Sequence, residues 1–382
     1  MKNGARDRGS RFLSLFTVVR FPNEMCLTTT HNNGTCYTPQ DCETKGGRPQ
    51  GPCASGFGVC CYFQYICSSN TMENGTYWVN PATPQSMCHL MITRMNNDIC
   101  QIRLELDVFE IAGPNEKGEC ADEFFLVTGG SPVPPICGVN NQQHLIYSVT
   151  PDSGPSQLSV ILSVSSTTQS SNARLWNIRI YQYECTSPVL APVGCLQHFM
   201  GASGMVMSFN YMEEIGTPAN LNGVNHLANL NYAACVRMES GYCGIRWAQY
   251  PNDMVSFTLS GDASGLTSTS PKDVKSVVYG DDTKSGCPYD YVRIPGGSED
   301  GNTHTSRERY CGQALGFCRV QTGKTVDCAA ALGAVITFAK PFVLGVVTDG
   351  DEGGKGTANN APEDKANRGF KLIYNQQPCM AG

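Results

Sequence analysis

The sequence predicts an all-β protein in which a small disulfide-rich module precedes two β-sandwiches. Three observations lead to this fold class. The 20 cysteines form a compact N-terminal group followed by two copies of one six-cysteine pattern. Short stretches rich in β-branched and aromatic residues recur between turns of Gly, Pro, Asn and Ser, which is typical of β-sandwiches. No long segment shows the 3.6-residue period of a helix.

The two cysteine patterns indicate an internal duplication, which sets the domain plan. "CQIRLEL" at Cys100 corresponds to "CGIRWAQ" at Cys243, and "ICG" at Cys137 corresponds to "YCG" at Cys311. The first copy contains Cys67, Cys88, Cys100, Cys120, Cys137 and Cys185. The second copy contains Cys195, Cys235, Cys243, Cys287, Cys311 and Cys379.

The cysteine count also predicts secretion. The total is even, and no Cys/His group has the spacing of a zinc site, so we expect disulfides, which persist outside the cell. Asn33 and Asn74 each begin an Asn-Gly-Thr glycosylation triplet. The basic and then weakly apolar residues 1–21 make a poor signal peptide. Three expectations stay open for this segment: a weak signal, a flexible segment or pro-segment, or export information that lies upstream.

Composition argues against nucleic-acid binding and against a membrane-spanning helix. The net charge of -6 and the pI near 5.6 argue against nucleic-acid binding, which needs a basic face. No apolar run approaches the roughly 18 residues of a membrane-spanning helix. At 382 residues, the chain is long enough for two or three domains.

Residues 22–66 form the N-terminal cysteine-rich module. This segment has too few apolar residues for a core, so disulfides must hold it. Its cysteines are Cys26, Cys36, Cys42, Cys53, Cys60 and Cys61, and spacing alone leaves all of their pairings open.

Residues 67–185 predict the first sandwich. In 101–111, the residues Ile102, Leu104, Leu106 and Val108 alternate with polar ones and should share one buried face. Further strands are expected at 123–130, 144–149, 157–164 and 175–183.

Residues 186–379 repeat this plan with longer loops. Strands are expected at 205–211, 242–250, 255–261, 290–297, 333–340 and 370–376. The insertions 261–286 and 350–369 are rich in Gly, Ser, Asp, Asn and Lys, and we interpret them as exposed spacers rather than recognition elements.

Several of these segments resemble a known family. "CPYDYVRIPGG" with "RYCG" and "GFKLIY" resembles the CUB domain, an extracellular jelly-roll sandwich. "CADEFFLVTGG" with "PICG" and "LWNIRIY" resembles it less closely. The leading module, with its terminal Cys-Cys, is similar to a clip domain, and the whole chain resembles the secreted CUB proteins of arthropods.

The resemblance implies a disulfide pattern. The CUB resemblance gives Cys67–Cys88, Cys120–Cys137, Cys195–Cys235 and Cys287–Cys311, and we pair the remaining cysteines as Cys100–Cys185 and Cys243–Cys379. The clip resemblance gives Cys26–Cys60, Cys36–Cys53 and Cys42–Cys61. Cys318 and Cys328 are close enough to pair with each other.

The resemblance also implies a calcium site, because many CUB domains hold Ca²⁺ with acidic loop residues. Asp290 matches the central acid of the family and Asp349 the later one, while Asp282 lies where a glutamate would be expected. In the first repeat Glu123 replaces the central aspartate, so a site there is less favoured. The alternative is that these acids are ordinary solvated loop residues.

No catalytic pattern is present. The chain has no Gly-x-Ser-x-Gly, His-Glu-x-x-His or phosphate-binding loop, and His144, His198 and His226 have no evident nucleophile partner. Trp176 and Trp247 should pack in cores, whereas Trp78 beside a glycosylation triplet should be more exposed.

We therefore predict a secreted, non-catalytic protein that binds another extracellular protein through loops of its CUB-like sandwiches, with calcium as a possible cofactor. Two other functions stay open. The chain would self-associate if it were a structural component of a matrix or cuticle. It would alter protease activity if the clip-like module regulated a clip-protease cascade.

Overall fold

The computed structural model describes residues 20–162, 174–211, 225–253, 255–261, 263, 276–279, 287, 289–298, 307–316, 334–350, 352 and 366–379. The chain divides into two compact units, Met1–Phe63 and Gln64–Gly382. Among the described residues, the structure has no helix of the length and apolarity that a membrane span requires.

The N-terminal unit is a small antiparallel sheet with one short helix. Its elements are β1 (Met25–Leu27), β2 (Asn33–Tyr37), α1 (Pro39–Thr44), β3 (Arg48–Cys53), a 3-10 turn (Ala54–Gly56) and β4 (Gly58–Tyr65). Strand β2 pairs with β1 and β4, and β3 pairs with the other side of β4. The helix begins where it does because the Thr38 hydroxyl accepts a hydrogen bond from Asp41 N and Pro39 occupies the first turn.

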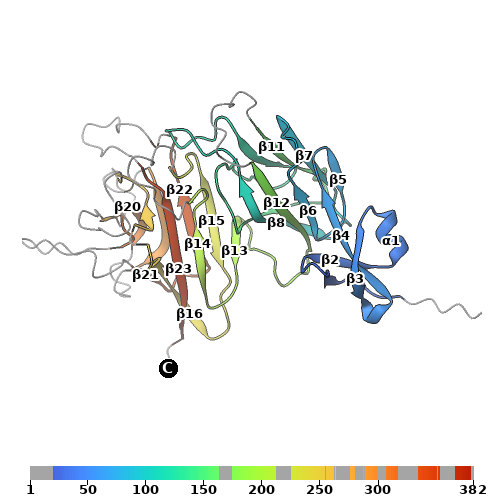
Figure 1. Ribbon diagram of the computed structural model, residues 1–382. Coiled ribbons are helices and arrows are strands. Elements are labelled where there is room, and N and C mark those ends of the chain that lie inside the picture. The colour runs from blue at the N-terminus through green and yellow to red at the C-terminus, as the bar shows by residue number, and fades with distance from the viewer. Residues whose placement is uncertain are drawn as a thin grey trace, which may run out of the picture. The chain divides into compact units, whose positions relative to one another are not determined.

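The first sandwich consists of two facing sheets. One has the order β6-β12-β8-β10 and the other the order β5-β7-β11-β9 (Figure 1). Their strands are β5 (Ser69–Thr71), β6 (Thr76–Val79), β7 (Met87–Ile92), β8 (Ile99–Glu110), β9 (Phe124–Thr128), β10 (Gln143–Ser148), β11 (Ser156–Ile161) and β12 (Leu175–Glu184).

The second sandwich repeats this strand order. One sheet is β14-β23-β16-β21, with β17 paired to β23, and the other is β13-β15-β22-β19-β20-β18. Its strands are β13 (Cys195–Phe199), β14 (Ser203–Met207), β15 (Asn231–Val236), β16 (Tyr242–Gln249), β17 (Phe257–Thr258), β18 (Ser276–Tyr279), β19 (Tyr291–Gly297), β20 (Arg307–Gly312), β21 (Ala334–Thr337), β22 (Phe342–Val347) and β23 (Gly369–Pro378). Each sandwich also opens with a parallel pair, β5 with β7 and β13 with β15, so the predicted duplication is confirmed at the level of topology.

The alternation expected along β8 holds only for its first half. Ile102, Leu104 and Leu106 are fully buried, but Val108 is half-buried and Phe109 takes the buried position instead. The cause is an irregularity in the pairing with β12. The adjacent β12 residues Asn177 and Ile178 pair with Val108 and Leu106, so the pairing skips one β8 residue. Because one β8 residue is skipped, the side chains beyond it change faces.

The described residues contain nine disulfides. Seven have the pairing that the resemblance implied, and Cys100–Cys185 and Cys243–Cys379 are the two that we paired from the remaining cysteines. The pairs are Cys26–Cys60, Cys36–Cys53, Cys42–Cys61, Cys67–Cys88, Cys100–Cys185, Cys120–Cys137, Cys195–Cys235, Cys243–Cys379 and Cys287–Cys311. Cys318 and Cys328 lie outside the described residues, as do most of the two long insertions.

Tryptophans mark the core of each sandwich. Trp176 and Trp247 are buried, as expected. The expectation for Trp78 was wrong, because it is 0% exposed and its ring centroid lies 5.7 Å from that of Trp176 and 6.3 Å from that of Phe125. The glycosylation triplet ends at Thr76, the first residue of β6, and Trp78 lies two residues further along that strand in the core of the sandwich.

Candidate metal centre

Three titratable side chains meet at one end of the second sandwich. His226 precedes β15, Asp290 directly precedes β19, and Glu352 follows β22. One potential ligand atom from each lies within 4.8 Å of those of the other two, and all three residues are buried. The sandwich brings these loop ends together, since the residues are far apart in the sequence.

Asp290 offers a carboxylate oxygen to this cluster. Its Oδ1 accepts a hydrogen bond from Asp349 N at 2.8 Å, whereas Oδ2 has no hydrogen-bond partner among the described residues. The residue is 1% exposed. Burial, and after it the charge of Glu352, raises the pKa of Asp290 to about 8. A buried carboxylate oxygen without a partner is costly, and a bound cation would offset that cost.

Both ring nitrogens of His226 lie near oxygen atoms. Its Nε2 lies 3.0 Å from Glu352 Oε2 and 3.1 Å from Leu259 O, and its Nδ1 lies 3.4 Å from Leu227 O. Burial, the largest single effect, lowers the pKa of His226. The charge and hydrogen bond of Glu352, together with the charge of Asp290 and the contact with Leu259 O, outweigh burial and raise the pKa to about 10.

In the first sandwich, the charge of the carboxylate that corresponds to Asp290 is balanced by a different kind of partner. Glu123, which replaces the aspartate of the second repeat, is 1% exposed. Its Oε1 accepts a hydrogen bond from Arg174 Nε at 2.6 Å, and its Oε2 accepts one from Ala112 N at 2.9 Å. An arginine therefore balances the buried carboxylate of the first repeat.

In the cluster of the second sandwich, the acidic side chains outnumber the basic one. Asp290 and Glu352 are buried and Asp349 is half-buried beside them, while His226 is the basic member of the metal-capable group. Two buried carboxylates against one imidazole give an arrangement that a divalent cation would complete.

The donor set can be compared with the needs of different ions. Calcium takes about six to eight oxygen ligands, which the carboxylates of Asp290 and Glu352 can begin to supply. An imidazole nitrogen, such as that of His226, suits zinc-type ions rather than calcium. The carboxylates thus fit both calcium and zinc-type ions, whereas the imidazole fits only the zinc-type ions.

The structure brings together two of the predicted calcium ligands. Asp290 and Asp349 are joined by the backbone hydrogen bond described above, whereas Asp282 lies outside the described residues. Sequence reasoning missed Glu352 and His226. Glu352 could have been predicted from the sequence, because it is three residues after Asp349 in "TDGDE". His226 in "VNHLANL" carries no local signal, and only the tertiary structure places it here.

Two of the other histidines, His144 and His198, serve in structural contacts. His198 N donates a hydrogen bond to His144 Nε2 at 2.8 Å, and Arg103 donates one to His198 O at 3.2 Å. Asn33, the asparagine of the first glycosylation triplet, begins β2 and is half-buried opposite Leu27.

The asparagine of the second glycosylation triplet is held to β12. Asn74 Nδ2 donates a hydrogen bond to Gln182 O at 3.2 Å, and its Oδ1 accepts one from Gln182 N at 2.8 Å. Glycosylation at Asn33 and Asn74 stays a prediction.

The fold is that of an all-β, disulfide-rich protein built from β-sandwiches, the architecture of many extracellular modules. Residues 192–377 match the family model described as "Animal CUB domain". CUB domains are generally non-catalytic, protein-binding modules of extracellular proteins, and they often bind calcium. The match covers the second sandwich, including every residue of the candidate metal centre.

Comparison with solved structures lists multidomain CUB fragments. The "CUB1-EGF-CUB2 domains of rat MASP-1" are 12% identical, with 82% of this chain and 99% of that chain covered and a TM-score of 0.23. The "CUB1-EGF-CUB2 domain of HUMAN MASP-1/3" is 12% identical, with 79% and 98% covered and a TM-score of 0.22. TM-scores this low do not establish a shared domain arrangement. The curated proteins contain no match to this chain.

Proposed function

We propose that this chain is a secreted, non-catalytic protein that binds another extracellular protein through the loop end of its second sandwich, and that a divalent cation organises that end. The observation that carries this proposal is the buried cluster of His226, Asp290 and Glu352, in which Asp290 Oδ2 has no hydrogen-bond partner among the described residues. The disulfides and the CUB match of residues 192–377 support an extracellular setting.

Calcium is the ion that the family match favours, with Asp290, Asp349 and Glu352 as the carboxylates that would surround it. Asp282 stays a predicted ligand. A bound cation would satisfy Asp290 Oδ2 and bind the loop after β22 to the start of β19. Partner recognition would then use loop residues whose positions depend on the ion.

The test is a pull-down from the native extracellular fluid, performed once with calcium and once with EDTA and read by mass spectrometry. We expect a partner protein that is recovered with calcium and lost with EDTA. Asp290→Asn, which keeps the side-chain shape but removes the charge, should lose the partner in both buffers. Asp152→Asn, at an exposed turn position of the first sandwich, is the matched control and should behave like the parent chain.

Two results would contradict the proposal. Recovery of only the chain itself in both buffers would favour the structural, self-associating function. Equal recovery of a partner with calcium and with EDTA, and by Asp290→Asn, would keep protein binding but remove the cation from it. The clip-like character of residues 22–66 and an arthropod-type relationship stay predictions from the cysteine pattern, and a clip-protease regulator would instead change protease activity when the full chain is added.

A further inference from the structure

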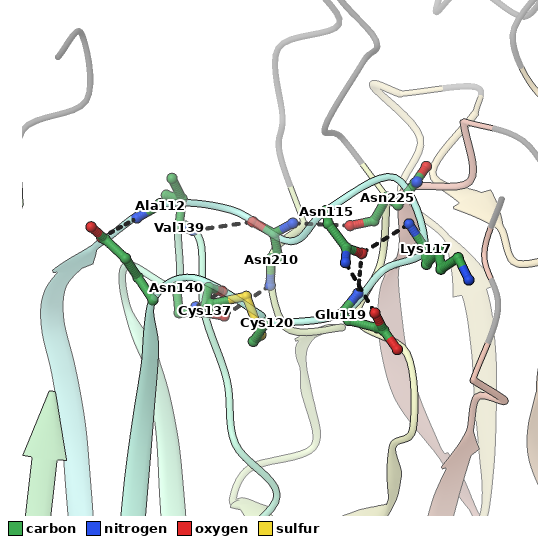
Figure 2. The surroundings of a disulfide bond; sticks show 11 residues. Ala112, Asn115, Lys117, Glu119, Cys120, Cys137, Val139, Asn140, Asn210 and Asn225 are labelled. Atoms are coloured by element: carbon green, nitrogen blue, oxygen red, sulfur yellow. Dashed lines mark hydrogen bonds between the residues drawn. A yellow bond between two sulfur atoms is a disulfide. The ribbon is translucent and has the colours of Figure 1, made fainter. Parts of the chain in front are cut away.

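One loop of the first sandwich lies directly against the metal-capable cluster of the second. We define this loop as residues 113–119, between β8 and the Cys120–Cys137 disulfide, and call it the docking loop. Figure 2 shows it beside Asn225, with Asn115, Lys117 and Glu119 on the loop itself. Three successive carbonyl oxygens of the loop accept hydrogen bonds from the second sandwich.

Each of these hydrogen bonds comes from the cluster or its near neighbours. Asn225 Nδ2 donates to Glu116 O at 3.0 Å, Glu352 N donates to Lys117 O at 3.2 Å, and Ala228 N donates to Gly118 O at 2.8 Å. Asn225 directly precedes His226, and Ala228 lies two residues after it. Glu352 contacts two partners: its backbone N contacts the loop, and its carboxylate contacts His226.

The docking loop has a shape fixed by its own bonds. Asn115 Oδ1 accepts hydrogen bonds from Lys117 N at 2.9 Å and Glu119 N at 3.0 Å, and Asn115 Nδ2 donates to Glu119 Oε2 at 3.0 Å (Figure 2). Gly118 has a φ of +76°, in the left-handed region that favours glycine. Carbonyls that are held in this way form a preformed surface for the three donors.

Gly118 also leaves no room for a side chain. A Cβ at this position would collide with Glu352 Cγ, and it would lie 2.9 Å from His226 O and 3.1 Å from Ala228 N. The loop therefore touches both the acidic and the basic member of the cluster. A side chain at position 118 would therefore have to displace the loop, His226 or Glu352.

Asn210 extends the contact between the sandwiches on the other side of the loop. Its backbone N donates to Asn140 Oδ1 at 2.8 Å, its Oδ1 accepts from Val139 N at 3.1 Å, and its Nδ2 donates to Asn225 O at 2.9 Å (Figure 2). Asn210 thus connects the segment after Cys137 with the residue that precedes His226. The contact and the cluster share one continuous set of hydrogen bonds.

We propose that cation binding at His226, Asp290 and Glu352 is coupled to the docking of the 113–119 loop, so that the ion fixes the first sandwich against the second as well as organising the recognition end. This inference rests on the proposed cation site. The coupling is reciprocal: a loop that cannot dock weakens cation binding, and cation binding stabilises the docked loop.

The test is the affinity of the full chain for calcium and for zinc, measured by isothermal titration calorimetry, with Gly118→Ala as the variant. We expect weaker binding of the ion by a factor of about 5 to 150, the usual range of coupling between two sites. Gly241→Ala is the matched control, because Gly241 has a φ of +86° but nothing within 4 Å of an added Cβ. It should bind the ion as the parent chain does.

A second measurement reads the coupling from the other side. Hydrogen exchange of the loop amides should slow when the ion is added to the parent chain, and should not respond in Asp290→Asn. Should Gly118→Ala fail to fold, Asn115→Ala removes the hydrogen bonds of the Asn115 side chain within the loop without adding a side chain at the contact, and it should also weaken ion binding.

The outcomes separate the two ideas. Binding of the ion by the parent and by the loop variants with equal affinity would overturn the coupling and leave the cation site intact. Absence of binding of either ion to the parent chain would overturn the cation site and the coupling together. A partner lost in EDTA with no change in exchange of the loop would support the proposed function and contradict the coupling.

Discussion

Replacing both Cys243 and Cys379 by serine should lower the free energy of unfolding of the second sandwich by about 5 kcal/mol. This disulfide closes a sequence separation of 136 residues. In the chain-entropy description, breaking a link across a loop of that length returns about 5 kcal/mol of conformational freedom to the unfolded chain. The equivalent bond of the first sandwich, Cys100–Cys185, spans 85 residues, and the same relation gives about 4.6 kcal/mol.

The folded state should change little in either variant. Cys243 is half-buried and Cys379 is exposed, so serine leaves no large cavity. Strands β16 and β23 pair from Tyr242–Pro378 to Gln249–Leu372, and these backbone hydrogen bonds hold the ends together without the disulfide. The loss should therefore arise almost wholly in the unfolded state.

The assay is equilibrium unfolding in guanidinium chloride, followed by tryptophan fluorescence and far-ultraviolet circular dichroism. The two double-serine variants should show similar losses, because the logarithm of loop length changes little between 85 and 136 residues. A loss below about 1 kcal/mol in both variants would refute the entropic reasoning. A large inequality between them would show that the folded states differ in how they tolerate the change.

Two further predictions concern buried polar contacts. Burial, and then the charge of Arg103, lowers the pKa of His144 from 6.5 to about 3, so the neutral ring that accepts the His198 N–H is favoured in the folded state. The contribution of the neutral His144 ring to the free energy of unfolding is complete above the unfolded pKa and declines as the pH falls. We expect urea unfolding to show a loss of about 2 kcal/mol between pH 7 and pH 5, and we expect this loss to be absent in His144→Gln. Arg368 donates a hydrogen bond to Asp253 Oδ2 at 2.7 Å in a buried pair, so Arg368→Met should cost about 3–5 kcal/mol. Adding Asp253→Leu should recover part of that cost, and a double variant as unstable as the single one would contradict the assignment to an uncompensated charge.

Much of the fold followed from local patterns in the sequence. Strands such as β12 and β19 have dense β-branched and aromatic residues, and each lies where it was expected. Strands β15 and β22 were missed. The first consists largely of small residues ("NYAACV") and the second is a continuous apolar run ("FVLGVV"), so neither alternates in polarity.

The candidate site was predictable only in part. Asp290 and Asp349 carried a signal because each stands in a short motif next to a strand. His226 carried none, since its place in the cluster depends on the backbone pairing of Asn229 with Asp349 and on the docking of Gly118 against the neighbouring residues. Such contacts join segments that are far apart in the chain, and no local pattern encodes them.

The sequence by itself determined the all-β class, the duplication and the oxidised cysteines, because residue periodicity and repeated cysteine spacing are local properties that survive without a structure. Only the tertiary structure decided which charges meet. It gave Glu123 an arginine and placed Asp290 with a histidine and a second acid. The physical reason is that the balance of a buried charge depends on groups a few ångströms away in space, and loops from three separate parts of the chain supply them.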